Sequence, residues 1–284
     1  MQNAKFKWLN SYEEDMKGLY LYCLREKTED TPVFSTKGID GKGEVFTLSF
    51  RGLEAVVSEV SLEEFGSIEI QEKARQDLSW IKEKAVAHEK VIEEAIRKND
   101  KILSLIPMRF GTIFKEKARL EESLDKDYSK VKEVLERIRD KQEWSVKVYL
   151  TNREKFERVI KEKNEAIKEK EKEIATLPEG MAFFMEEELS EIVSREMEAE
   201  LNNMAEVFFE GLKKHAVDSV KNKILEKELT GKREPMILNA AYLIHKKEIK
   251  KFEKEVDDLN RRMEEEGYCL EVSGPWPAYN FTSY

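Results

Sequence analysis

The stretch Glu143-Trp-Ser-Val-Lys-Val-Tyr-Leu150, near the middle of the chain, alternates apolar and polar side chains. Its apolar positions are Trp144, Val146, Val148 and Leu150. Alternate residues of a strand share one face, so this stretch predicts a half-buried β-strand. Counted from it, the rest of the chain reads strand, helix, strand, strand, helix, strand. That order is typical of ferredoxin-like folds.

The elements after this strand follow from hydrophobic periodicity. They are a helix over about 182–214, strands over 216–225 and 236–244, a helix over 248–265 and a last strand over 268–273. Residues 151–177 contain eight basic and seven acidic side chains and few apolar ones. We predict that they form a solvated helix or helical hairpin inserted before the first main helix.

The residues before Glu143 predict a related module. Its elements are an apolar strand over 18–25, strands over 45–50 and 53–58, a helix over 73–98, a strand over 102–107 and a helix over 116–140. Arg51-Gly52 joins two strands by two residues, which predicts a hairpin. We interpret residues 18–107 as a ferredoxin-like half whose first helix is reduced or lost, and 116–140 as a helix that bridges two domains.

The predicted fold class is therefore α+β, with two tandem modules and long charged helices. The first domain is a modified ferredoxin-like domain with the bridging helix, residues 1–141. The second, residues 142–284, is an α+β domain of ferredoxin-like order with the charged insertion and an aromatic C-terminal tail. The length of 284 residues agrees with two domains of ordinary size.

Charge and composition exclude several classes of protein. The net charge is −9, and no basic stripe is present, which argues against nucleic-acid binding. The two cysteines, Cys23 and Cys269, lie far apart without a CxxC motif, and we expect reduced thiols. No apolar run long enough for a signal peptide or a membrane span occurs, so we expect no export and no membrane insertion.

Motifs that carry chemistry are missing from the sequence. It has no GxGxxG, GxxxxGK[ST], GxSxG or HExxH motif, and its three histidines, His88, His215 and His245, lie far apart. We predict no catalytic residue, no cofactor and no metal. His88 falls on the apolar stripe of a helix, so we expect it to be a structural, hydrogen-bonded residue.

Two segments are candidates for partner contact or for pinning the domains. In Ile106-Pro-Met-Arg-Phe-Gly-Thr-Ile-Phe114, Arg109 and Phe110 stand among apolar residues. An arginine in such company either closes a salt bridge or lies at a contact surface, because an unpaired buried charge is costly. Both readings of Arg109 stay open here.

The second segment is the tail Gly274-Pro-Trp-Pro-Ala-Tyr-Asn-Phe281. Its aromatic residues Trp276, Tyr279 and Phe281 either hold the tail against its own domain or serve as recognition anchors. We expect the first, with Trp276 buried and Trp276→Ala costing about 3–5 kcal/mol of stability.

Several short segments occur together in a specific order. They are the opening Tyr20-Leu-Tyr22, Gly38-Ile-Asp-Gly41, Trp80 with Ala87-His88-Glu89, Ile106–Thr112, Glu143–Val148, Leu238-Asn-Ala-Ala-Tyr-Leu243 and the closing Gly274–Phe281. In this set the chain resembles the gas vesicle accessory protein F/L family (GvpF/GvpL) over almost its whole length. Ser145 and Ala278 are mild departures from the family pattern.

The resemblance implies a non-enzymatic protein of gas vesicle formation, located in the cytoplasm and at the gas vesicle. It implies contacts with the hydrophobic wall protein and with other gas vesicle accessory proteins, as a minor vesicle component or an assembly factor that limits wall-protein aggregation. We expect the N-terminal module, with its hairpin strands and Arg109, to carry much of the wall-protein contact. No catalytic residue is implied.

A different class of function stays open from the fold alone. Tandem ferredoxin-like modules can pair into an α+β barrel that holds a ligand or cofactor, and such proteins include enzymes. That reading requires a pocket with convergent polar groups, and the separated histidines argue against it.

Overall fold

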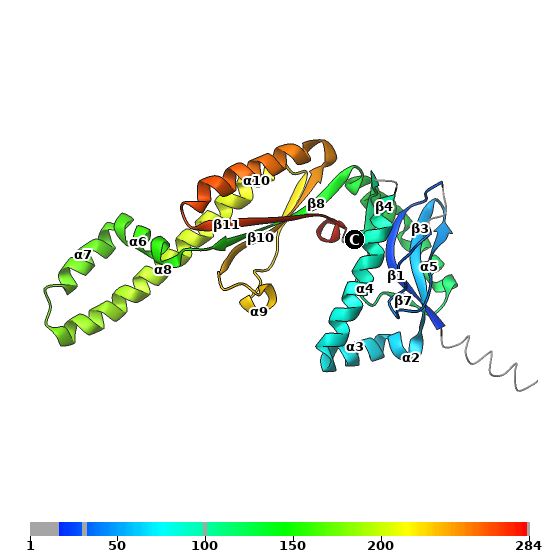
Figure 1. The fold of residues 1–284 in the computed structure, drawn as a ribbon, viewed down its shortest axis with the longest axis horizontal. Coiled ribbons are helices and arrows are strands. Elements are labelled where there is room, and N and C mark those ends of the chain that lie inside the picture. Colours follow the sequence, from blue (N-terminus) through cyan, green and yellow to red (C-terminus); the bar gives the residue numbers. More distant parts are fainter. Residues whose placement is uncertain (1–16, 30–32, 99–100, 283–284) are drawn as a thin grey trace, which may run out of the picture. The chain divides into compact units, whose positions relative to one another are not determined.

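The computed structural model describes residues 17–29, 33–98 and 101–282. The chain divides into two compact units. Figure 1 draws the ribbon in colours that run from blue at the N-terminus to red at the C-terminus. Unit 1 comprises Met1–Gln142 and Pro277–Tyr284, and unit 2 comprises Glu143–Trp276. The prediction of an α+β fold is confirmed, with an antiparallel main sheet in each unit. The ferredoxin-like classification of the modules stays a prediction.

The main sheet of unit 1 has the strand order β2-β3-β1-β6, and β7 also pairs with β1. The strands are β1 (Lys17–Glu26), β2 (Val45–Phe50), β3 (Leu53–Ser61), β6 (Leu105–Pro107) and β7 (Ile113–Phe114). A separate small ladder joins β4 (Arg97–Lys98) to β5 (Lys101–Ile102). β1 and β3 are buried along nearly their whole length, which indicates that both faces of the sheet are covered.

The helices of unit 1 supply that cover. They are α2 (Leu62–Phe65), α3 (Ser67–Gln76), α4 (Leu78–Ile96) and α5 (Lys117–Ile138). The single helix predicted over 73–98 is wrong, because the chain breaks at Asp77. The Asp77 carboxylate accepts hydrogen bonds from the backbone N–H groups of Ser79 and Trp80, so it caps a new helix at that point.

The predicted hairpin in unit 1 is confirmed. Phe50 pairs with Leu53, and the two residues between them, Arg51 and Gly52, both have positive φ, of 47° and 84°. Two such residues are the signature of a turn whose twist matches that of the flanking strands. β2 therefore continues directly into β3 and lies at one end of the strand order.

Unit 2 contains a sheet of order β11-β8-β10-β9. Its strands are β8 (Lys141–Leu150), β9 (Asp218–Lys221), β10 (Met236–His245) and β11 (Tyr268–Trp276). Its helices are α6 (Arg153–Lys163), α7 (Glu165–Ile174), α8 (Glu179–Lys213), α9 (Lys227–Thr230) and α10 (Ile249–Glu264). The alternation of Glu143–Leu150 predicted β8 well, since Val146, Val148 and Leu150 are core residues beneath α8 and α10.

The strand predicted over 216–225 is shorter in the structure. Beyond Lys221 the side-chain amide of Asn239 donates to the carbonyl of Lys223 at 2.8 Å. The Asn222 N–H also donates to the Asn239 carbonyl at 2.7 Å, so one backbone bond and one side-chain bond hold the segment that follows the strand.

The charged insertion forms α6 and α7, which pack along the first half of α8 as a helical arm (Figure 1). Asn164 separates α6 from α7, and its side chain accepts a hydrogen bond from the Ile167 backbone N–H at 3.2 Å. Ile167 and Ile174 face the core of unit 2, while most charged residues of the arm face solvent. The helical interpretation of 151–177 is thus correct.

Candidate partner-binding site

A buried polar network links α4 to β1 in unit 1. His88, 4% exposed, lies with Nδ1 2.9 Å from the Tyr20 hydroxyl and Nε2 3.2 Å from the Met108 carbonyl. A carbonyl can only accept, so we infer that Nε2 carries the proton and that Nδ1 accepts from Tyr20. Burial lowers the pKa of His88 to about 4, so the ring is neutral near pH 7. The expected structural role of His88 agrees with this geometry.

The same network fixes the loop between β6 and β7. The backbone N–H of Gly111 donates to the Tyr20 hydroxyl at 3.0 Å, and the Met108 N–H donates to the Tyr22 carbonyl at 2.8 Å. Gly111 has φ of 82°, a conformation that residues with a Cβ adopt rarely. Phe110 packs edge-on against the rings of Tyr20 and His88. Phe110 therefore holds the loop to the body of unit 1.

Arg109 is the exposed residue of this loop. Its carbonyl accepts hydrogen bonds from the N–H and the hydroxyl of Thr112, but its guanidinium makes no ion pair with the residues that the structure describes. Both readings of Arg109, a salt bridge between the domains and a partner contact, stay predictions. Partner contact stays a proposal for this side chain.

Residues 277–281 of the C-terminal tail belong to unit 1 and residues 274–276 to unit 2, whereas we predicted the whole tail in the second domain. The Tyr279 hydroxyl donates to Glu89 Oε2 on α4 at 2.8 Å, and Arg137 Nη2 on α5 donates to the Phe281 carbonyl at 2.6 Å. Phe281 is buried. Tyr279 and Phe281 therefore pin the tail, but they pin it to the helices of the first unit.

The side chain of Trp276 is not buried, although we predicted a buried anchor. It is 39% exposed, pairs with Glu143 at the end of β11, and its indole N–H donates to Ser273 Oγ at 3.0 Å. The loss of about 3–5 kcal/mol that is usual for a buried aromatic therefore does not apply to Trp276→Ala. β11 is the outermost strand of its sheet, and an edge strand tolerates the flanking prolines.

The structure brings only some of the predicted site residues together. Phe110 and Tyr279 both lie against α4, at His88 and its neighbour Glu89. Arg109 lies on the β6–β7 loop, and the hairpin strand β2 lies at the other end of the strand order. Trp276 belongs to unit 2.

Within the described residues, β2 is an edge strand of the main sheet of unit 1. Among the described residues, β3 is its ladder partner on one side, and the strand order ends there. Phe46, Leu48 and Phe50 alternate along β2 and are half-buried. An edge strand offers unpaired backbone N–H and C=O groups, and here it also carries a row of apolar side chains. This edge is the feature of unit 1 best suited to binding another polypeptide strand.

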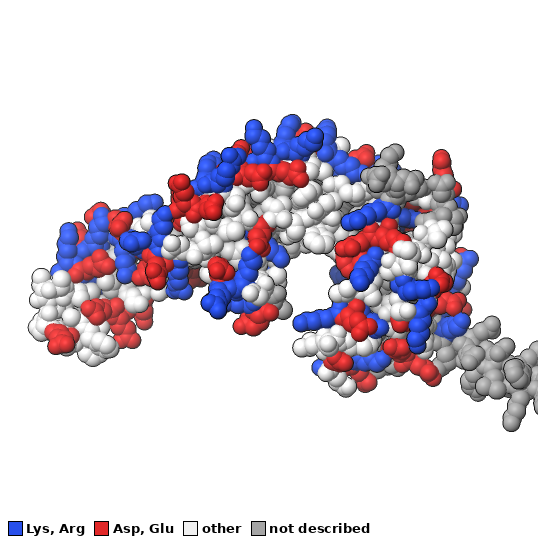
Figure 2. Space-filling view, viewed as in Figure 1, with Lys and Arg blue, Asp and Glu red and all other residues white. Residues whose placement is uncertain are grey.

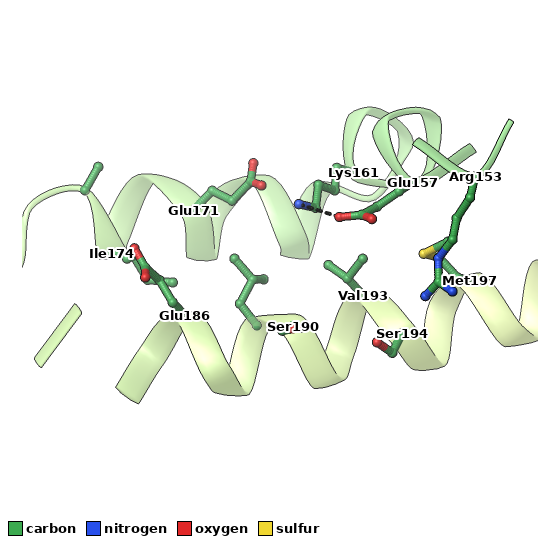
Figure 3. A pocket seen from close by; sticks show the side chains of 12 residues that line it. Arg153, Glu157, Lys161, Glu171, Ile174, Glu186, Ser190, Val193, Ser194 and Met197 are labelled. Carbon is green, nitrogen blue, oxygen red and sulfur yellow. Dashed lines mark ion pairs between the residues drawn. The ribbon is translucent and has the colours of Figure 1, made fainter. Parts of the chain in front are cut away.

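The helical arm holds a groove of about 480 Å³ between α6, α7 and α8 (Figure 3). Val193 and Met197 lie at its base, and charged side chains surround them. Glu157 pairs with Lys161 at 3.0 Å along α6. This pair runs along a single helix, as is usual on a solvated helix surface.

A feature that the sequence analysis missed lies at the free end of the arm. Met181, Phe183 and Phe184 are exposed on the first turns of α8, and Glu179 and Glu186 are exposed close to them in the sequence. The signal was available, because Ala182 and Met185 continue the core stripe of the helix and adjacent residues are turned by about 100°. The two phenylalanines lie off that stripe and are exposed.

Neither metal-binding geometry nor a membrane span is found in the part of the chain that the structure describes. No three His, Cys, Asp or Glu side chains there converge as metal ligands. No helix of that part combines the length and the apolar character needed to cross a bilayer.

Comparison with known proteins identifies a family, relatives and solved structures that are similar to this chain. Residues 18–283 match the family model described as gas vesicle synthesis protein GvpL/GvpF. Gas vesicle protein F of Nostoc sp. is 24% identical over 87% of this chain and 91% of its own length, and gas vesicle protein L1 of Halobacterium salinarum is 23% identical over 93% and 90%. The crystal structure of GvpF from Anabaena sp. PCC7120 has a TM-score of 0.74 at 19% identity, covering 94% of this chain and 99% of that one. That of GvpF from Microcystis aeruginosa has a TM-score of 0.65.

Proposed function

The chain belongs to the gas vesicle synthesis protein GvpL/GvpF family, and we propose that it is a non-enzymatic assembly factor that binds the gas vesicle wall protein. Membership of the family supports a role in gas vesicle formation. The finer proposal is that the chain holds wall subunits before they polymerise and so limits their aggregation. Other accessory proteins of the vesicle are further proposed partners. We place this activity in the cytoplasm and at the gas vesicle.

The open edge of β2 is the observation that carries the proposal. A β-rich, hydrophobic subunit exposes strand edges and apolar surface before it assembles, and such edges aggregate. β2 can add to such an edge through its backbone while Phe46, Leu48 and Phe50 meet alternate apolar side chains. The net charge of −9 keeps the complex dispersed through repulsion between copies.

The alternative of a cofactor-binding barrel has less support. The described residues provide no metal-ligand cluster, and His88 is occupied by Tyr20 and Met108 inside a packed core. The relatives are named as gas vesicle proteins. An absorbance scan and a native mass spectrum of the purified protein test this alternative, and stoichiometric flavin, haem or zinc would favour it.

A proline at Thr47 tests the edge. Hydrogen-bonded and non-hydrogen-bonded pairs alternate along an antiparallel ladder, and Phe50–Leu53 closes a two-residue hairpin. We therefore expect Thr47 to direct its backbone N–H to the open edge. Thr47→Pro removes that donor, and we expect it to weaken capture of the wall protein by the tagged full-length chain about tenfold or more.

Thr47→Val is the matched control, because it keeps the backbone N–H and should keep binding. A thermal melt of both variants verifies that the edge strand is still folded. Arg109→Ala tests the other candidate site of unit 1, the β6–β7 loop. If Arg109→Ala abolishes capture while Thr47→Pro leaves it unchanged, the site lies at the β6–β7 loop and the proposed edge is wrong.

A further inference from the structure

The free end of the helical arm carries an aromatic tip, defined as Met181, Phe183 and Phe184. Their side chains are 59%, 65% and 71% exposed, and the two phenyl rings lie 5.8 Å apart at 80°. Phe183 and Phe184 are the two most exposed aromatic residues in the part of the chain that the structure describes. Clustered exposed apolar side chains of this kind mark interaction sites.

The backbone that presents the aromatic tip is firmly supported. Ala182 and Met185, on the opposite side of the same turn, pack against the core of unit 2. Ile174 at the end of α7 and Leu189 on α8 belong to that core. The tip is therefore a fixed surface and does not depend on a change of fold.

The surroundings of the tip are strongly acidic. Between Glu171 and Glu191 the chain has seven acidic residues and one basic residue. Glu179, Glu186 and Glu187 are exposed on α8, and red atoms border the uncharged end of the arm in Figure 2. Two such tips would repel each other, so a symmetric contact between tips is disfavoured. The complementary partner combines aromatic residues with positive charge.

One segment of this chain has that chemistry. Residues 1–12 contain no acidic residue, and Lys5-Phe-Lys-Trp-Leu9 alternates two lysines with two aromatic residues. The segment lies outside the residues that the structure describes. It also precedes residues 18–283, the part of the chain that matches the family model. The aromatic tip lies within that match.

We propose that the aromatic tip binds the segment Lys5–Leu9 of a second copy of this chain. Phe6 and Trp8 pack against Phe183 and Phe184, and the lysines pair with the carboxylates beside them. Because the two surfaces differ, the contact is head-to-tail and joins copies into rings or open chains. This inference is independent of wall-protein binding by β2.

A labelled peptide of residues 1–12 tests the contact by fluorescence anisotropy. The titrant is the full-length Lys5→Glu/Lys7→Glu variant, whose own segment no longer matches the tip in charge. We expect saturable binding with a Kd on the order of 10⁻⁵ to 10⁻⁴ M. Adding Phe183→Ser/Phe184→Ser should weaken it about tenfold or more. Leu78→Ser, which removes an equally exposed apolar side chain from unit 1, is the matched control and should change nothing.

A charge exchange makes the test independent of the phenylalanines. A peptide with Lys5→Glu/Lys7→Glu should bind the wild-type tip poorly and recover binding on Glu186→Lys/Glu187→Lys. Sedimentation of the wild-type chain should show association that grows with concentration and is lost in Phe183→Ser/Phe184→Ser. A peptide that binds wild-type and double-serine proteins equally, or a wild-type chain that stays monomeric where the peptide binds, would overturn the proposal.

Discussion

Glu54→Ala is expected to lower the free energy of unfolding of unit 1 by about 3–5 kcal/mol, the usual cost of breaking a buried ion pair. Arg25 Nη2 on β1 lies 3.1 Å from Glu54 Oε2 on β3, and both side chains are 3% exposed. Arg25 Nη1 also donates to the Ala95 carbonyl at 2.7 Å, near the end of α4. The variant would leave the guanidinium charge buried without its counter-ion. Urea denaturation of the full-length chain measures the loss.

A second ion pair between the same two strands is the control. Lys17 and Glu59 are 3.0 Å apart and more than half exposed, so Glu59→Ala should cost about 1 kcal/mol or less. Arg25→Leu/Glu54→Leu should recover much of the stability, because it removes both charges. Equal losses in Glu54→Ala and Glu59→Ala would mean that burial does not determine the effect.

Acidification is expected to destabilise unit 1 through His88. The pKa of His88 is about 4 in the folded chain, against an ordinary value of 6.5. Between these values the unfolded chain binds more protons, so stability is complete above pH 6.5 and falls as the pH decreases toward 4. The total loss from this residue is about 3 kcal/mol, of which about 2 kcal/mol falls between pH 7 and pH 5.

Comparison with His88→Gln isolates this effect from the titration of carboxylates. Denaturation of both proteins at pH 7, 6 and 5 should give a wild-type free energy that decreases more steeply than that of the variant. The difference in slope, and not the stability of the variant at neutral pH, is the diagnostic quantity. Parallel pH profiles for the two proteins would contradict the neutral, buried state of His88.

Local patterns predicted the elements whose burial follows one period. The alternation of Val146, Val148 and Leu150 predicted the strand β8, and Arg51-Gly52 predicted the β2–β3 hairpin. The predicted boundaries are wrong where one side chain overrides the apolar pattern. Asp77 divides a helix whose apolar spacing runs through it, and beyond Lys221 the Asn239 side chain bonds the Lys223 carbonyl where a longer strand was predicted.

The candidate site was harder to predict, because it depends on which distant segments meet. The roles of Tyr279 and Phe281 as pins follow from Glu89 and Arg137, and no spacing in the sequence relates these residues. The exposure of Trp276 depends on the edge position of β11. By contrast, Phe183 and Phe184 could have been placed outside the core from the stripe of α8 alone.

The aggregation of the wall protein tests the proposed function most directly. Wall subunits are diluted from denaturant with an equimolar amount of the full-length chain, and light scattering is followed over time. We predict that the chain suppresses the scattering, and that Thr47→Pro loses most of this effect while Thr47→Val keeps it. Scattering that rises equally with the chain and with an unrelated acidic protein would contradict the proposal that this protein holds wall subunits during gas vesicle assembly.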